Sequence, residues 1–307
     1  MTILYEHDAA LDHVTPPGHP ERVARIEAIR GALAAPAFEA LDRREAPLAD
    51  RSEVLRCHPE AYVARIEATI PETGFRSIDA DTHVSAGSLE AALRAVGGVA
   101  AAVDAVIAGE DRTAFVAMRP PGHHAERETA MGFCLFGTAA IGAKRALDHH
   151  GLARVAVLDF DVHHGNGTQD LLWDEARALF ASSHQSPLWP GTGGVHETGA
   201  HDNVLNAPLA PMTGGAEMRR VWGDIILPAV DDFAPELIII SAGFDAHAAD
   251  PLANLNWVEE DFVWLTRAIR EVAEAHGQGR VVSTLEGGYD LDALASSTAA
   301  HIAALME

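Results

Sequence analysis

The alternation of short apolar runs with helical patterns restricts the fold of this chain more than any other feature of its sequence. The expected strands are rich in Val, Ile, Leu or Ala and cover residues 3–5, 114–118, 155–158, 179–183, 237–241 and 281–285. The expected helices carry apolar residues at helical spacing and cover residues 21–33, 59–70, 87–107, 138–149, 169–176, 215–230, 257–275 and 291–306. Strands that alternate with helices predict a single α/β domain with an open parallel sheet and helices on both faces.

The long Ala-rich helix expected at residues 87–107 contains two adjacent glycines, Gly97 and Gly98. Glycine lowers the stability of a helix interior, so a pair of glycines there needs a compensating reason. We expect a neighbouring element to pack closely against this helix at the two glycines.

The composition of the chain limits its possible binding partners and its cellular compartment. The formal net charge of -23, without a basic cluster, argues against nonspecific binding to nucleic acid or to an anionic membrane. It favours either encounter with a cationic substrate or simple solubility. The two cysteines, Cys57 and Cys134, lie far apart and suggest no disulfide framework. No signal peptide is evident and no apolar run approaches the ~20 residues of a membrane span, so we expect a cytoplasmic protein.

Polar side chains and glycines follow four of the expected strands, at the point where each strand ends. These residues are His123 and His124, then Asp159, Asp161, His163 and His164, then Gly243, Asp245 and His247, and finally Glu286, Gly287, Gly288 and Tyr289. In a parallel sheet the carboxyl ends of the strands meet at one edge, which is where ligands bind. One such loop has an ordinary structural explanation, but four together predict a functional site.

Two carboxylates and one imidazole, from Asp161, His163 and Asp245, form a plausible divalent-metal site. Three protein ligands leave a position open for water or substrate, as catalytic zinc requires, and Fe²⁺ would accept the same ligands. A metal at this site would lower the pKa of a water molecule and polarise a carbonyl group.

The paired histidines His123 and His124 are candidates for the general base and acid, because neighbours can move an imidazole pKa across neutral pH. Asp159 and Asn166 are available to orient them. Tyr289 could donate a hydrogen bond to a developing oxyanion. Taken singly, these residues are more often surface histidines or a packed turn tyrosine, and only the joint set favours catalysis.

Eight segments resemble the motifs of the zinc-dependent histone deacetylase family and occur in the family's order. They are H-P-E (19–21), R-P-P-G-H-H-A (119–125), G-F-C (132–134), L-D-F-D-V-H-H-G-N-G-T-Q (158–169), P-G-T-G (190–193), S-A-G-F-D-A-H (241–247), D-P-L (250–252) and E-G-G-Y (286–289). The chain is most similar to the class II-like branch, which includes bacterial histone deacetylase-like amidohydrolases and acetylpolyamine amidohydrolases. The resemblance implies one catalytic domain over residues 1–307, with about eight strands in an arginase/deacetylase-like sheet.

The resemblance also implies a role for each motif residue. The zinc ligands are Asp161, His163 and Asp245, and the catalytic set is His123, His124, Tyr289, Asp159 and Asn166. A second, potassium-like cation site comprises Asp159, Asp161, His163, Ser182 and the Ser183 carbonyl. The substrate-binding residues are Gly132, Phe133, Trp189, Leu252, Asp81 and Gly287. Trp189 departs from the Phe or Tyr that is more familiar at this wall of the tunnel. Arg25 resembles the arginine of an internal acetate channel, and His164 is expected to be structural.

The implied activity is removal of acetyl or another short acyl group from acyl-lysine, or from a similar small-molecule or peptide N-acyl amine. Leu252 cannot pair with a cationic chain, which favours a neutral acyl-lysine stem over an acetylpolyamine, although the acidic surface keeps the polyamine alternative open. A silent acyl-lysine binder is disfavoured because the catalytic set is complete. A two-metal phosphoesterase would need further bridging ligands. The substrate, the acyl length and a possible homo-oligomeric state stay open.

Overall fold

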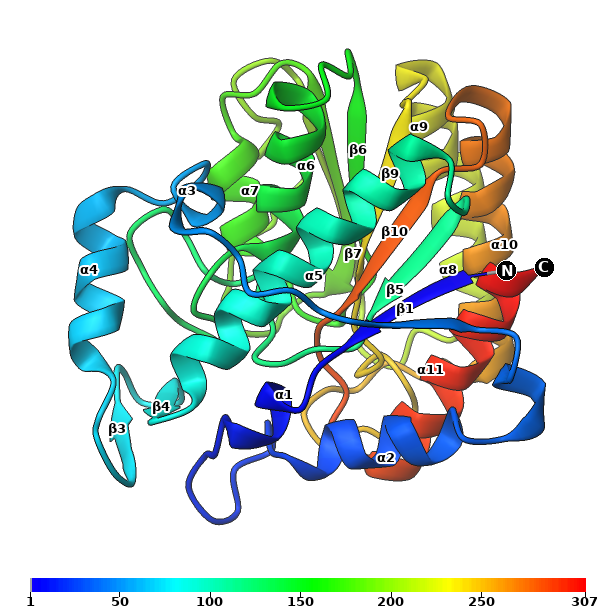
Figure 1. The fold of residues 1–307 in the computed structure, drawn as a ribbon. Helices are drawn as coiled ribbons and strands as arrows, with labels where there is room; N and C mark the ends of the chain where they lie inside the picture. Colours follow the sequence, from blue (N-terminus) through cyan, green and yellow to red (C-terminus); the bar gives the residue numbers. More distant parts are fainter. Residues whose placement is uncertain (1) are drawn as a thin grey trace.

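Eight parallel strands form one sheet in the computed structural model, which describes residues 2–307 (Figure 1). The strands are β1 (Thr2–Glu6), β2 (Asp42–Glu45), β5 (Thr113–Val116), β6 (Val155–Asp159), β7 (Ala178–Gln185), β8 (Val204–Leu209), β9 (Leu237–Ala242) and β10 (Val281–Leu285). Their order across the sheet is β2-β1-β5-β10-β9-β6-β7-β8, and every neighbouring pair is parallel. The expected α/β class and strand number are confirmed.

Helices lie on both faces of this sheet, with α5 and α6 across one face and α8 to α11 toward the other (Figure 1). The helices are α1 (Ala9–Asp12), α2 (Ala24–Ala32), α3 (Arg51–Val54), α4 (Glu60–Thr69), α5 (Ser88–Ala108), α6 (Thr138–Asp148), α7 (Asn166–Leu172), α8 (Gly215–Val221), α9 (Leu227–Phe233), α10 (Glu259–His276) and α11 (Leu291–Met306). A short 3₁₀ helix covers Pro36–Phe38, and a small antiparallel hairpin joins β3 (Phe75–Ser77) to β4 (His83–Ser85). Because both faces are covered, every residue of the central strands β6, β9 and β10 is buried.

The two outermost strands were not predicted from the sequence, and their composition explains why. Strand β2 reads D-R-R-E and alternates between half-buried and exposed residues, so it carries no apolar run. Strand β8 contains Pro208, which cannot donate a hydrogen bond to a neighbouring strand and is tolerated at a sheet edge. An edge strand forms because it pairs with an existing sheet, so its local sequence gives only a weak strand signal.

Two predicted helices differ from the observed ones. The helix expected at 169–176 is α7, which begins at Asn166 and ends at Leu172, so Asn166 lies on a helix instead of in a loop. The helix expected at 215–230 was predicted with an interruption near Pro228, and the observed interruption comes slightly earlier, as a π-helical segment at Trp222–Ile226 between α8 and α9. Pro228 lies two residues after the π-helical segment, where the regular hydrogen-bond pattern of the helix is already interrupted.

Helix α5 corrects the expectation that no apolar run reaches membrane-spanning length. Its 21 residues are long and apolar enough to cross a bilayer by length and composition alone. However, 67% of its most apolar window is buried inside the protein, where the helix packs on α1, α6 and β5. Burial in the core therefore accounts for its apolar composition.

Close packing at the two glycines of α5 is confirmed. A Cβ atom on Gly97 would lie 1.9 Å from the Pro47 carbonyl oxygen and 2.8 Å from the Ala49 nitrogen. A Cβ atom on Gly98 would lie 2.9 Å from Cγ1 of Val116. The glycines let the segment that follows β2 lie directly against the helix, which compensates for their low helix propensity.

We predict that Gly97→Ala destabilises the protein by about 1–3 kcal/mol, because the added methyl group meets backbone atoms that cannot move aside easily. Gly31→Ala is the matched control, since the same change in α2 meets no atom within 4 Å. We expect this control to be neutral or stabilising by up to about 1 kcal/mol. Denaturant unfolding of both variants measures the difference, and equal stabilities would contradict the packing argument.

Candidate active site

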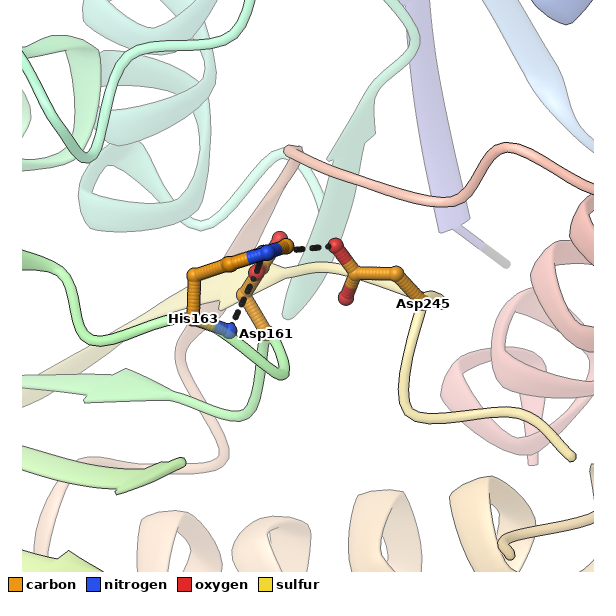
Figure 2. Close-up of side chains that lie close together, drawn as sticks. All are labelled: Asp161, His163 and Asp245. Carbon is orange, nitrogen blue, oxygen red and sulfur yellow. Dashed lines mark hydrogen bonds and ion pairs between the residues drawn. The ribbon is translucent and has the colours of Figure 1, made fainter. Parts of the chain in front are cut away.

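The four loops that carry the predicted site residues follow strands β5, β10, β9 and β6, which are consecutive neighbours in the sheet. Asp161 and His163 follow β6, and Asp245 follows β9 (Figure 2). Direct pairing of β6 with β9 therefore brings together residues that are more than 80 positions apart in the chain. The sequence expectation that these loops gather at one edge of the sheet is confirmed.

Three side chains converge at this edge to form a group that could hold a metal ion. One ligand atom from each of Asp161, His163 and Asp245 lies within 4.8 Å of the others. The Nδ1 atom of His163 is 3.2 Å from Oδ1 of Asp161 and 3.2 Å from Oδ2 of Asp245 (Figure 2). Both carboxylates are only 1% exposed, so their charges are poorly screened by solvent.

The electrostatics of this group favour a bound cation. Burial opposes a charge on His163, but hydrogen bonds to Asp161 and Asp245 and their charges raise the pKa of this imidazole to about 10. Burial and the charge of Asp161 raise the pKa of Asp245. The two carboxylates thus attract positive charge, and an imidazole with two carboxylates is a ligand set that zinc or iron(II) accepts. The residues present fit the metal that the sequence predicts.

Glycines allow the protein backbone to approach the two carboxylates. A Cβ atom on Gly243 would lie 2.0 Å from Oδ2 of Asp161, and one on Gly287 would lie 2.2 Å from Oδ2 of Asp245. The Gly287 N–H donates to Oδ2 of Asp161 at 2.8 Å, and the Val162 N–H donates to Oδ1 of Asp245 at 2.9 Å. Gly287 therefore lies against both carboxylates, and its expected contact with substrate stays a prediction.

The tandem histidines are oriented by the two partners that the sequence suggested. The Nδ1 atom of His123 is 2.9 Å from Oδ2 of Asp159, and that of His124 is 2.7 Å from Oδ1 of Asn166. The Asn166 amide nitrogen donates to Glu126 at 2.8 Å, which turns its oxygen toward His124. Each imidazole therefore carries a proton on Nδ1, and Nε2 of His124 is left as an acceptor.

The two histidines differ in their preference for charge. Burial disfavours the charged form of His123, but the carboxylates of Asp161 and Asp159 raise its pKa well above the usual value. Burial and the positive charges of His123 and His163 lower the pKa of His124 well below the usual value. A cation on Asp161 would offset part of that carboxylate's effect, whereas Asp159 keeps its direct contact with His123. The pair therefore combines a charged donor with a neutral acceptor.

Glu286 is a residue of this site that sequence reasoning did not assign. Its Oε2 atom accepts the N–H groups of Gly122 and His123 at 2.7 and 3.1 Å, and Ser241 donates to Oε1 at 3.2 Å. Burial raises the pKa of this carboxyl group to about 7. Its side chain thus holds the backbone of the tandem histidines. The acidic residue that opens E-G-G-Y was visible in the sequence, but its target is a backbone group with no signature there.

A pocket of about 330 Å³ opens next to the metal-ligand group. Its lining includes the predicted residues Asp81, His124, Gly132, Phe133, His163, Trp189, Leu252 and Tyr289, together with His19, Pro20, Ala80 and Leu188, which were not predicted. Phe133, Trp189, Leu188 and Leu252 make much of its wall apolar. The structure therefore brings the metal-ligand group and a partly apolar pocket together.

Aromatic rings and one glycine shape the inner part of the pocket. The Trp189 ring contacts His124 edge to face at a centroid distance of 4.7 Å, and Phe133 contacts Tyr289 in the same way at 5.8 Å. A Cβ atom on Gly132 would lie 2.5 Å from the His124 ring and 2.7 Å from Trp189. A side chain at position 132 would therefore fill the passage between the wall and the histidine.

Tyr289 and Arg25 meet behind the pocket. Burial raises the pKa of the Tyr289 phenol well above its usual value, so the group remains a hydrogen-bond donor at neutral pH. The Arg25 guanidinium lies 5.0 Å from the centre of the Tyr289 ring and donates to the carbonyl oxygens of Glu286 and Gly288. Arg25 thus supports the loop that carries Tyr289. Its assignment to an internal channel stays a prediction.

The remaining predicted residues have defined positions. Ser182 pairs with Asp159 across β6 and β7, and its hydroxyl group contacts His184. The Ser183 hydroxyl group accepts a hydrogen bond from Trp222 at 3.0 Å. Their proposed share in a potassium-like site stays a prediction. His164 contacts Thr192 and Gln169 through its two ring nitrogens and is buried; its structural role also stays a prediction.

Comparison with known proteins agrees with this fold and site. Residues 19–305 match the histone deacetylase domain. The chain is 39% identical over 285 residues to a histone deacetylase-like amidohydrolase of Pseudomonas aeruginosa. This alignment covers 92% of the present chain and 73% of the amidohydrolase. It is 38% identical over 312 residues to a probable deacetylase of Archaeoglobus fulgidus, with coverage of 100% and 86%.

A solved structure shares the fold. The crystal structure of the HDA15 HD domain superposes with a TM-score of 0.93 at 30% identity, covering 99% of this chain and 91% of that one. The sheet and its surrounding helices therefore define a deacetylase-like α/β domain. The chain belongs to the histone deacetylase family, whose members include deacetylases and amidohydrolases.

We predict that Asp245→Asn weakens zinc binding by at least about 10–100-fold, the loss that follows removal of even an outer partner of a metal ligand. Elemental analysis and chelator competition measure this loss. Asp174→Asn is the matched control, because Asp174 is exposed and its ion pair within residues 2–307 is with a surface histidine, His201. Full zinc occupancy in Asp245→Asn would exclude this residue as a ligand.

Proposed function

We propose that the protein is a zinc-dependent deacylase that removes acetyl or other short acyl groups from acyl-lysine side chains or similar N-acyl amines. The observation that carries this proposal is the convergence of Asp161, His163 and Asp245 beside His124, at the inner end of an apolar pocket. The family to which the chain belongs supports the same class of reaction.

A zinc or iron(II) ion bound by Asp161, His163 and Asp245 would polarise an amide carbonyl and lower the pKa of a water molecule. The protein's own residues would then move the protons. His124 is the better acceptor, because its Nε2 atom is free and burial with neighbouring positive charge keeps it neutral. His123, held charged against Asp159, would stabilise negative charge developing beside it.

Tyr289 would donate its phenolic hydrogen to the oxygen of the attacked carbonyl group. Tyr289 is one of the residues that line the pocket, and its hydroxyl group stays protonated because burial raises its pKa. A donor held in place before reaction stabilises an oxyanion without reorganisation in the transition state. The amine product would leave after protonation by the histidine pair.

We predict that Tyr289→Phe lowers kcat by about 10²–10³-fold, which is the usual loss when one oxyanion donor is removed. The zinc content should stay at the level of the unaltered protein, because Tyr289 is not in the metal-ligand group. Steady-state kinetics with an acetyl-lysine peptide, together with elemental analysis, measures both quantities. Unchanged turnover would eliminate the oxyanion role.

The pocket wall supports a neutral, aliphatic stem in the substrate. Phe133, Trp189 and Leu252 present apolar surface along the way to the histidines, and an uncompensated charge buried there would be unfavourable. The methylene chain of an acyl-lysine meets this requirement. An acetylpolyamine carries positive charge farther along its chain, and the acidic composition of the protein is the observation that favours it.

We predict higher kcat/KM for an acetyl-lysine peptide than for N-acetylputrescine. Leu252→Glu should shift the ratio toward the polyamine by up to about fivefold, since one additional ion pair at a side chain that is 36% exposed is worth at most about 1 kcal/mol. Leu252→Gln is the matched control, with similar shape and no charge. A preference of the unaltered protein for N-acetylputrescine would overturn the acyl-lysine assignment.

A further inference from the structure

We propose that Asp250 is a positioning residue that fixes both Tyr289 and the pocket wall at Leu252. This inference rests on the proposed function, because it assigns Asp250 to the Tyr289 described above. Oδ2 of Asp250 accepts the N–H of Tyr289 at 2.7 Å and the N–H of Asp290 at 3.4 Å. Oδ1 accepts the N–H of Leu252 at 3.0 Å. One carboxylate thus joins two loops that lie 37 positions apart.

The hydrogen-bond partners of Asp250 indicate that its side chain fixes the backbone of two loops. All three are neutral backbone N–H groups, and the residue is only 7% exposed. Burial and the charge of Asp245 raise the pKa of the Asp250 carboxyl group to about 7, and the three N–H donors oppose this rise by stabilising the charged form. The neighbouring carboxylates Asp161 and Asp245 belong to the metal-ligand group, but Asp250 lies outside that group. Its contacts therefore serve the two loops and not the metal.

Asp250 is itself held rigidly. Its N–H donates to the His247 carbonyl at 2.9 Å, and the Ala248 N–H donates to the Trp257 carbonyl at 2.9 Å. Pro251 follows, which fixes its own backbone angle and restricts the conformation of Asp250. A carboxylate on such a turn can define the position of a second loop, because the turn has little freedom to follow that loop.

The loop that carries Tyr289 needs this constraint at its far end. Its first part is held by other groups: Arg25 donates to the carbonyls of Glu286 and Gly288, and Asp161 accepts the Gly287 N–H. Gly288 has φ +119°, a backbone conformation that side-chain-bearing residues rarely adopt. The direction in which Tyr289 leaves this glycine is set next by its N–H bond to Asp250.

Loss of the Asp250 carboxylate should move the Tyr289 hydroxyl group away from the reacting carbonyl. A displacement of about 1 Å in an active site can cost about 10²-fold in rate. Asp250→Ala removes both acceptor oxygens. Asp250→Asn keeps one oxygen and can still satisfy one of the two loops, so its effect should be smaller. Asp290→Asn is the matched control, because Asn replaces Asp as an N-cap of α11 at little cost.

We expect Asp250→Ala to lower kcat for an acetyl-lysine peptide by about 10–10²-fold, Asp250→Asn to lower it less, and Asp290→Asn to leave it unchanged. The decisive measurement is a double-mutant cycle with Tyr289→Phe. If Asp250 acts through Tyr289, adding Asp250→Ala to Tyr289→Phe should cost less than about threefold more. An equal further loss in the double variant would overturn the inference, and so would an Asp250→Ala variant with normal kcat.

Amide hydrogen exchange gives a second measurement that does not depend on turnover. In metal-free protein, Asp250→Ala should increase the exchange rates of the Tyr289 and Leu252 amides, while those of the buried strand β9 stay unchanged. Unchanged rates at Tyr289 would refute the positioning contact. Normal activity of Tyr289→Phe, in contrast, would refute the proposed oxyanion role and leave the exchange result to decide what Asp250 does.

Discussion

The structure depends on an electrostatic constraint: three buried carboxylates must lie close together at one edge of the sheet. Asp159, Asp161 and Asp245 are each at most 1% exposed. Such a concentration of negative charge is stable only where positive charge and N–H donors surround it. His123 and His163 supply positive charge, and raised pKa values in both imidazoles follow from the same field. The group that could hold a metal ion thus also raises the pKa of His123, whereas the pKa of His124 is lowered.

Backbone groups complete this arrangement, and they explain the glycines at the ends of the central strands. A side chain on Gly243 or Gly287 would occupy the space of the carboxylates. Because Gly287 has no side chain, its N–H can donate to Asp161. Two further carboxylates accept backbone N–H groups of site residues: Glu286 accepts the N–H of His123, and Asp250 accepts that of Tyr289. Acidic side chains here position the protein backbone and also form the group that could hold a cation.

The sequence predicted the centre of the fold better than its margins. Strands buried on both faces, such as β9, must be continuously apolar and therefore leave a strong signal. The edge strand β2 pairs on one side only and consists of charged residues, so it leaves none. The site follows the same division. Ligands and tandem histidines need particular functional groups, whereas the roles of Glu286 and Asp250 depend on backbone N–H groups that any residue carries.

Local sequence determined which side chains the chain could offer for chemistry: Asp161 and His163 after β6, which could hold a metal ion, the tandem histidines after β5 and the tyrosine after β10. Each depends on residue type and short spacing, which the chain specifies directly. Only the tertiary structure decided that β5, β10, β9 and β6 lie side by side. Strand order arises from how the crossover helices pack on the sheet, an energy spread over many distant residues. That order is what places Asp245 against His163 and Asp250 against Tyr289.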